Sequence, residues 1–138
     1  MKILILCTGN SCRSQMAQGI LQAFDKNIEV YSAGTNPAEI IHPKAVIMLN
    51  ELGLDISNHY PKNADEYLNE EWDFVITVCD GAKETCPVFL GKVKNRVHMG
   101  FEDPADATGT EDEIMNKFRK IRDEILRDFF TFYNKNIR

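Results

Sequence analysis

A continuous apolar run near the N-terminus passes directly into a short loop and then into a helical pattern. The run covers Ile3–Leu6, and its uninterrupted apolar character is typical of a strand that is covered on both faces. From Ser11 onward the apolar residues recur at helical spacing, at Met16, Ile20, Leu21 and Phe24. A buried strand that leads at once into a helix favours an α/β fold with a parallel sheet, whose sites lie at the carboxyl ends of the strands.

Strand and helix patterns continue to alternate along the rest of the chain. Further strands are predicted at Ile28–Tyr31, Phe74–Val78 and Arg96–His98. Helices are predicted at Pro43–Leu52 and Glu111–Tyr133, with a weaker helical stretch at Asn63–Asn69. No repeat, linker or low-complexity tract divides the chain, so we expect one doubly wound α/β domain over residues 1–138.

The composition is that of a globular protein with an ordinary core. Of the 138 residues, 43% are hydrophobic and 27% are charged, and no stretch approaches the roughly 20 apolar residues that cross a bilayer. No secretory segment is expected, because the apolar run is short and enters the loop. The net charge of −5 disfavours nucleic-acid binding. The basic clusters Lys92–Arg96 and Arg119–Arg127 are interpreted as solvated loop and helix faces.

The loop between the first strand and the first helix combines a thiol, an arginine and a backbone suited to anions. Gly9 and Asn10 adopt positive φ most easily, and N–H groups that converge above a helix N-terminus bind tetrahedral oxyanions. Arg13 offers a planar pair of donors to two oxygens of such an anion. Cys7 lies in the same positive field, which favours its thiolate form and makes it a candidate nucleophile. The predicted anion site comprises Thr8, Gly9, Asn10, Ser11, Cys12 and Arg13.

The four cysteines allow several interpretations. Two structural disulfides suit a small secreted protein, but this chain is long enough to fold without them. Zinc is disfavoured, since no cysteine pair has zinc-finger spacing and no histidine lies at ligand spacing from one. A reducing cytoplasm with functional thiols is therefore predicted. Cys7 and Cys79 each follow a strand, so both should lie at the functional edge of the sheet. The plainer alternative is that Cys7, Cys79 and Cys86 are small buried residues.

The segment Cys7–Ser14 reads Cys-Thr-Gly-Asn-Ser-Cys-Arg-Ser and resembles the Cys-x5-Arg-[Ser/Thr] loop of the low-molecular-weight protein tyrosine phosphatase superfamily. Within that superfamily, Cys7–Ala17 is similar to the thioredoxin-coupled arsenate reductases. The resemblance covers essentially the whole chain, through Tyr31–Gly34, Asp55–His59, Val78-Cys79 with Cys86-Pro87, and Asp103–Ala105. It implies a four-stranded parallel sheet flanked by helices on both faces.

The resemblance also implies a thiol–disulfide relay. Reduction of arsenate to arsenite needs two electrons, and two thiols that become one disulfide supply them. Cys7 would attack arsenate, and Cys79 would attack the adduct to leave a Cys7–Cys79 disulfide. Cys86 would then convert it to a Cys79–Cys86 disulfide that thioredoxin reduces. Arg13 would stabilise the oxyanion, and Cys12 is implied to be a loop spacer outside the relay.

Two further residues take roles from the resemblance. Asp103 precedes Pro104 and would be the general acid that protonates the leaving oxygen, although Asp-Pro by itself is mostly a turn signal. Ser14 would hydrogen-bond the Cys7 thiolate, and a serine at this place is also a common helix cap. Ala105 stands where the phosphatases have an aromatic residue, which favours the reductases.

No bound cofactor or metal is expected. Some members of the superfamily bind potassium, but Gln18 and Lys62 stand where acidic ligands occur, which argues against potassium dependence here. The three histidines, His42, His59 and His98, have no carboxylate or cysteine at a telling spacing and are interpreted as structural. The expected protein is a cytoplasmic monomer whose substrate, arsenate, competes with phosphate or sulfate.

Two alternative functions stay open. One is a phosphatase that uses Cys7, Arg13 and Asp103 on phosphotyrosine or small aryl phosphates, since one loop can hold either oxyanion. The pair Cys79 and Cys86, together with Ala105, argues against it. The other is a noncatalytic thiol sensor or anion-binding adaptor. The complete set of a nucleophile, an arginine and an acid, Cys7, Arg13 and Asp103, argues against this function.

Overall fold

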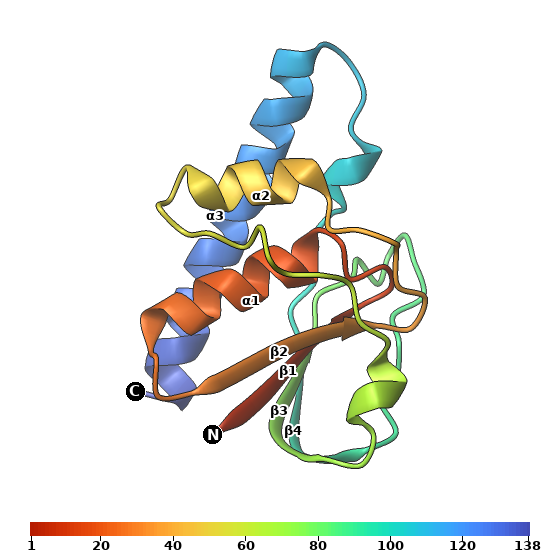
Figure 1. The fold of residues 1–138 in the computed structure, drawn as a ribbon, viewed down its shortest axis with the longest axis vertical. Coiled ribbons are helices and arrows are strands. Elements are labelled where there is room, and N and C mark those ends of the chain that lie inside the picture. The colour runs from red at the N-terminus through yellow and green to blue at the C-terminus, as the bar shows by residue number, and fades with distance from the viewer.

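A computed structural model describes all residues, 1–138, and contains one four-stranded parallel sheet with the strand order β2-β1-β3-β4 (Figure 1). The strands are β1 (Lys2–Cys7), β2 (Glu29–Gly34), β3 (Glu71–Thr77) and β4 (Lys92–His98). The α-helices are α1 (Arg13–Phe24), α2 (Pro43–Asn50) and α3 (Glu111–Asn136), and the 3-10 helices are η1 (Ala64–Tyr67) and η2 (Pro104–Asp106). The predicted fold class is confirmed.

The strand register brings the carboxyl ends of the strands to one edge of the sheet. In the β1–β2 pair Cys7 lies opposite Gly34, and in the β1–β3 pair Leu6 lies opposite Thr77. In the β3–β4 pair Thr77 lies opposite His98. The loops after β1, β3 and β4 therefore start at the same level, although more than 60 residues separate Cys7 from Thr77 in the chain.

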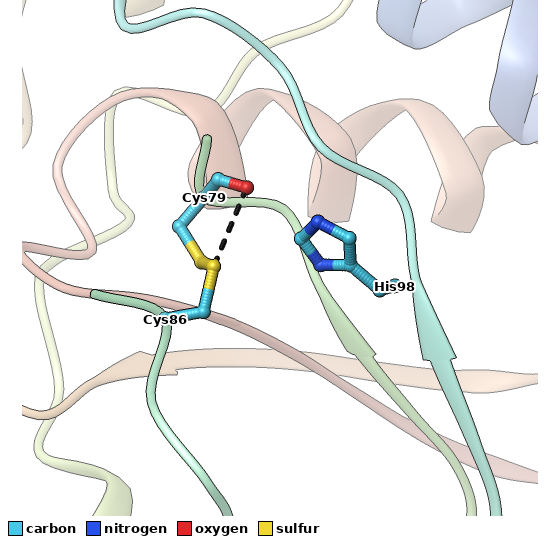
Figure 2. Close-up of side chains that lie close together, drawn as sticks. All are labelled: Cys79, Cys86 and His98. Atoms are coloured by element: carbon cyan, nitrogen blue, oxygen red, sulfur yellow. Dashed lines mark hydrogen bonds between the residues drawn. A yellow bond between two sulfur atoms is a disulfide. The ribbon is translucent and has the colours of Figure 1, made fainter. Parts of the chain in front are cut away.

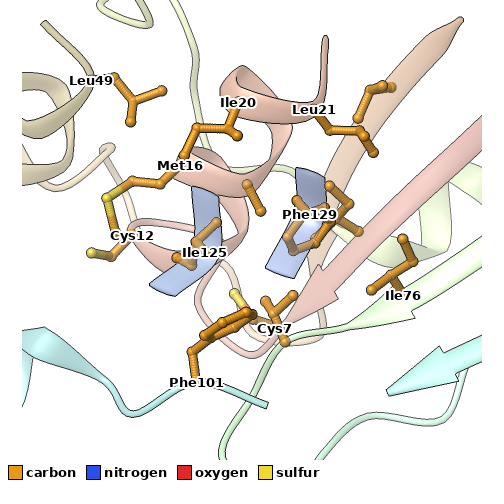
Figure 3. Close-up of a cluster of buried hydrophobic side chains, with 14 of the residues drawn as sticks. Cys7, Cys12, Met16, Ile20, Leu21, Leu49, Ile76, Phe101, Ile125 and Phe129 are labelled. Carbon is orange, nitrogen blue, oxygen red and sulfur yellow. The ribbon is translucent and has the colours of Figure 1, made fainter. Parts of the chain in front are cut away.

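The two faces of the sheet are covered differently. One face packs against α1 and α3, and α2 packs on both of these helices. Figure 3 shows part of this core, with Met16 and Ile20 of α1 beside Ile125 and Phe129 of α3. The opposite face has a smaller core that is closed by η1, the ring of Phe89 and the fully buried indole of Trp72. The helix on this second face is thus a short 3-10 helix.

The element boundaries shift from the prediction at several places. The strand expected at 28–31 is Glu29–Gly34, and the one expected at 96–98 begins at Lys92. The basic cluster Lys92–Arg96 is therefore part of the edge strand β4 and not a loop. Lysines on an exposed edge strand oppose its pairing with strands of other chains. The weak helix expected at 63–69 is only η1, which begins with a capping box between Asn63 and Glu66.

The last helix is longer and better capped than its pattern indicated. Thr110 and Glu113 form a capping box at the start of α3, which continues to Asn136. Trp72 and most phenylalanines of this helix are buried in the core, but Phe130 is 48% exposed. None of the helices is both long enough and apolar enough to cross a membrane.

Candidate active site

The loop at residues 8–12 is anchored from outside by its carbonyl groups. The carbonyl oxygens of Thr8, Gly9 and Ser11 accept hydrogen bonds from the backbone of residues 36, 38 and 42 at 2.8–3.0 Å. A carbonyl that points outward turns the neighbouring N–H groups toward the inside of the loop. The N-cap residue of α1, Cys12, makes no side-chain cap, so the first amides of the helix remain free to bind an anion.

The thiol of Cys7 lies within this loop, almost completely buried. Ser14 Oγ lies 2.9 Å from Cys7 Sγ, and the backbone N–H of Asn10 donates to the same sulfur at 3.2 Å. Asn10 Nδ2 donates to Ser14 Oγ at 2.8 Å, which leaves the hydroxyl proton of Ser14 to donate to the sulfur. The sulfur therefore faces two donors, and this arrangement stabilises a thiolate.

Asn10 holds the loop together from its centre. It has φ of 50°, whereas Gly9, the other residue expected to adopt positive φ, does not. Its fully buried amide donates to Ser32 Oγ at 2.9 Å and accepts from the backbone N–H of Lys62 at 2.9 Å. Gln15 Nε2 donates to the Asn10 carbonyl oxygen at 3.0 Å. One asparagine thus joins the loop to β2 and to the segment that precedes η1.

Gly34 allows the end of β2 to approach the loop closely. A Cβ at this position would lie 2.2 Å from the carbonyl oxygen of Thr8 and 3.1 Å from the backbone nitrogen of Asn10. Both contacts are with backbone atoms, so a side chain could not be accommodated without moving the loop. Gly34 is therefore needed for the shape of the site.

The guanidinium of Arg13 is bound by a carboxylate. Arg13 is 5% exposed, and its Nη1 and Nη2 donate to the two oxygens of Glu84 at 2.6 and 3.0 Å. Nη1 also donates to the carbonyl oxygen of Phe101 at 3.1 Å. The hydrogen bond from Arg13 lowers the pKa of Glu84, so this side chain is a charged carboxylate. In this state, Glu84 takes the pair of donors that the sequence assigned to an oxyanion.

Asp103 also faces Arg13. Its Oδ2 lies 3.6 Å from Arg13 Nη2, and its Oδ1 accepts from the backbone N–H of Ala105 at 3.0 Å. The side chain is therefore the N-cap of η2, in agreement with the turn interpretation, and it is also a neighbour of Arg13.

Cys79 and Cys86 are joined by a disulfide, with their Cα atoms 5.7 Å apart. Cys79 is completely buried and Cys86 is half-buried, so the bridge reaches the surface through Cys86. A single turn lies between them, in which the N–H groups of Lys83 and Glu84 donate to the Asp80 carbonyl. Cys7 and Cys12 are free thiols.

The two free thiols have different surroundings. Burial raises the pKa of the Cys12 thiol, and the negative charge of Asp103 raises it further. Cys12 also lies within the apolar core, where Figure 3 shows it beside Met16. Cys12 is therefore protonated and inert at neutral pH.

A cavity of about 200 Å³ lies beside Glu84 and Asp103, the two carboxylates that face Arg13. It is lined by Lys83 and by five carboxylates, those of Asp80, Glu84, Glu102, Asp103 and Asp106. So many carboxylates at one opening repel a dianion. The disulfide-bonded state consequently has an acidic cavity on the side of Arg13 that Glu84 and Asp103 occupy.

The sequence interpretation missed several residues of the site. Ser32 and Gln15 support Asn10, and a signal for Ser32 was its position directly before Ala33-Gly34 at the end of a strand. Nothing in the local sequence indicated that Glu84 would reach Arg13. His98 has no cysteine at a telling spacing in the sequence, yet its ring lies beside the disulfide in Figure 2, because β4 pairs with β3. Sequence spacing does not show such a pairing.

Family comparison agrees with this architecture. The model of the low molecular weight phosphotyrosine protein phosphatase family matches residues 2–136. Because the match includes nearly the whole chain, the protein belongs to this family.

Within the family, the similarity is to arsenate reductases. An arsenate reductase of Bacillus subtilis is 46% identical over 131 residues, which are 92% of this chain and 93% of the relative. One of Halalkalibacterium halodurans is 44% identical over 131 residues, 94% and 93% of the two chains. A solved structure described as an arsenate reductase in the phosphate binding state superimposes with a TM-score of 0.80 at 27% identity, covering 97% of each chain.

Proposed function

We propose that this protein is an arsenate reductase that passes its oxidation through Cys7, Cys79 and Cys86. The observation that carries the proposal is the Cys79–Cys86 disulfide next to a phosphatase-type anion loop. Hydrolysis of a phosphate ester needs no such disulfide, whereas two thiols that reduce a substrate are themselves oxidised to a disulfide. The arsenate reductases among the relatives support the same conclusion.

The first step is attack by Cys7 on bound arsenate. The Cys7 thiolate forms an S–As bond, and one hydroxyl group of the hydrogen arsenate leaves as water after receiving a proton from Asp103. Arg13 and the loop N–H groups stabilise the charge on the remaining oxygens. For arsenate to reach Arg13, the carboxylate of Glu84 has to leave it first, because both would use the same donors.

The second and third steps exchange thiols and disulfides. Cys79 attacks the sulfur of Cys7, the S–As electron pair goes to arsenic, and arsenite leaves with arsenic reduced by two electrons. Cys86 then attacks Cys79, releases the Cys7 thiolate and forms the disulfide of this structure. The free thiol of Cys7 and the bonded pair correspond to the end of this sequence.

The electron donor in this proposal is thioredoxin. Cys86 is half-buried, and the residues after it, Val88 and Leu90, are 76% and 85% exposed. An apolar exposed segment next to an accessible disulfide suits a dithiol protein better than a small reductant. The proposal also includes a monomer in a reducing cytoplasm, with no bound cofactor and no dependence on potassium.

A second candidate function is hydrolysis of phosphotyrosine or aryl phosphates. The family and the set of Cys7, Arg13 and Asp103 favour it as a residual activity. It would use the first step alone, followed by attack of water on the phosphocysteine.

The decisive experiment is an NADPH-coupled arsenate assay with thioredoxin and thioredoxin reductase, with glutaredoxin plus glutathione in parallel. We expect sustained NADPH oxidation only in the presence of arsenate, the protein and the thioredoxin system. Turnover with glutathione and glutaredoxin alone would contradict the proposed donor. Hydrolysis of aryl phosphate without any arsenate reduction would make phosphatase the function.

A further inference from the structure

Three side chains with strong affinity for soft metal ions meet at the carboxyl edge of the sheet. They are Cys79, Cys86 and His98, and their ligand atoms all lie within 4.8 Å of one another. Figure 2 shows the imidazole beside the disulfide. The three residues come from the end of β3, the following loop and the end of β4.

The fold, and not the local sequence, brings His98 to the cysteines. Thr77 lies opposite His98 in the register of β3 and β4, and Cys79 follows Thr77 by two residues. The loop then returns Cys86 to Cys79. His98 is thus the last residue of β4, Cys79 lies two residues beyond the end of β3, and Cys86 lies in the loop between these strands.

The ring of His98 is oriented so that one nitrogen is left for a metal. Thr77 Oγ1 lies 2.8 Å from Nδ1, so Nδ1–H can donate to it, which leaves the lone pair on Nε2. Histidines that bind metals usually have their second nitrogen fixed in this way. Thr77 would thus be the residue that fixes the tautomer.

Glycines keep the space between the imidazole and the sulfurs open. A Cβ on Gly81 would lie 3.8 Å from both Cys86 Sγ and His98 Nε2. A Cβ on Gly100 would lie only 3.0 Å from Nε2. A side chain at Gly100 would therefore press on the nitrogen that an ion has to approach, whereas a Cβ at Gly81 would only come into ordinary contact with both groups.

We propose that the reduced protein binds one Zn²⁺ through Cys79, Cys86 and His98, with water as the fourth ligand. Zinc takes about 2.3 Å to sulfur and about 2.0 Å to imidazole nitrogen, in tetrahedral geometry. A dithiol reductant first opens the disulfide with two electrons and two protons. The two sulfurs then move apart around the ion, and both thiol protons are released when it binds.

Zinc binding and the disulfide exclude each other, because both use the same two sulfurs. A zinc-loaded protein cannot form a disulfide at Cys79, whereas Cys7 and its donors are outside the triad. The ion would therefore stop thiol–disulfide exchange at Cys79 while the anion loop remains intact. The site itself does not depend on arsenate being the substrate.

Cobalt is the probe, because Co²⁺ bound by thiolates has strong sulfur-to-metal charge-transfer absorption. Protein reduced and then freed of reductant under argon is titrated with CoCl2, and Zn²⁺ is then added. We expect one equivalent of Co²⁺ with thiolate absorption, displaced by one equivalent of Zn²⁺. Protein with the disulfide intact should show no such absorption.

The variants distinguish the three-ligand site from adventitious thiol binding. Cys86→Ser should remove most of the charge-transfer band, and His98→Ala should weaken Co²⁺ binding at least about tenfold. The matched control His59→Ala, which removes a histidine that contacts Gln15, should bind as the wild type does. Cys7→Ser should also bind Co²⁺ as the wild type does, although it loses all catalysis. A failure of the proposed zinc site can therefore be distinguished from a failure of the proposed arsenate reductase function. An unchanged affinity in His98→Ala, or no thiolate band in reduced protein, would overturn the site.

Discussion

The loop at Cys7–Ser14 is enclosed by hydrogen bonds from β2, from the segment before η1 and from residues 36–42, and most of its side chains are buried. The segment that follows Cys79 is held differently. Apart from the disulfide, its main attachments are Glu84 on Arg13 and the buried ring of Phe89, and most of its other side chains are exposed or half-exposed.

This difference separates two tasks. An anion site works best when its donors are in place before the anion arrives, which requires the dense network around Asn10. A thiol that bonds to one cysteine and then to another must travel, and segments with few buried contacts open at the lowest cost in free energy. The protein thus joins a fixed anion site to a segment that can rearrange.

The largest effect is expected from removing the nucleophile of the fixed loop. Cys7→Ser should lower both arsenate reduction and aryl phosphate hydrolysis by at least about 10³-fold, because both begin at the same sulfur. Initial rates in the coupled assay and with an aryl phosphate would measure this. Cys12→Ser is the comparison, since the raised pKa of Cys12 keeps its thiol inert, and it should retain most activity. Near-normal rates in Cys7→Ser would remove this residue from its proposed role.

The next largest effect is expected in the segment that follows Cys79, and it separates arsenate reduction from aryl phosphate hydrolysis. Cys79→Ser and Cys86→Ser should each reduce multiple-turnover arsenate reduction by at least about 100-fold and leave aryl phosphate hydrolysis nearly unchanged, because hydrolysis needs no second thiol.

The two serine variants should stop at different points. Without Cys86, one arsenite per protein still forms and the Cys7–Cys79 disulfide accumulates. Without Cys79, no thiol is placed to attack the arsenic adduct. Mass spectrometry of quenched single turnovers would identify the bonds, and sustained turnover by both variants would refute the relay.

The sequence predicted the structure of the loop at Cys7–Ser14 far better than that of the segment that follows Cys79. An apolar strand, a loop and a helix in direct succession determine where Cys7 and Arg13 lie, because neighbours in the chain remain neighbours in the fold. The contacts of Glu84 and His98 arise from pairings across the sheet edge, between residues that are far from their partners in sequence. Such contacts depend on strand register and on the path of a loop, which composition and periodicity do not encode.

The stability of the two regions should differ in the same direction. Asn10→Ala leaves the buried hydroxyls of Ser14 and Ser32 and the half-buried backbone N–H of Lys62 without their partner. It also places alanine at positive φ, so the free energy of unfolding should fall by about 3 kcal/mol. Asp80→Ala, which removes one exposed hydrogen bond to Ala82, should cost less than about 1 kcal/mol. Urea denaturation of both variants would measure the difference, and equal losses would contradict the contrast between the regions.

The smallest effect concerns the place where the two regions touch. In the disulfide-bonded protein, Glu84 competes with any anion for Arg13, and its lowered pKa keeps it charged well below neutral pH. Glu84→Gln retains the size of the side chain but removes its charge, so sulfate should bind the oxidised protein about three- to tenfold more tightly. Isothermal titration calorimetry would measure this.

Asp106→Asn is the control, because Asp106 lines the same cavity without an ion pair to Arg13, and should change sulfate affinity less. In reduced protein, where the disulfide no longer holds the segment in place, the advantage of Glu84→Gln should shrink. An equal gain from both variants would mean that the summed negative charge of the cavity, and not the contact between Glu84 and Arg13, keeps anions out.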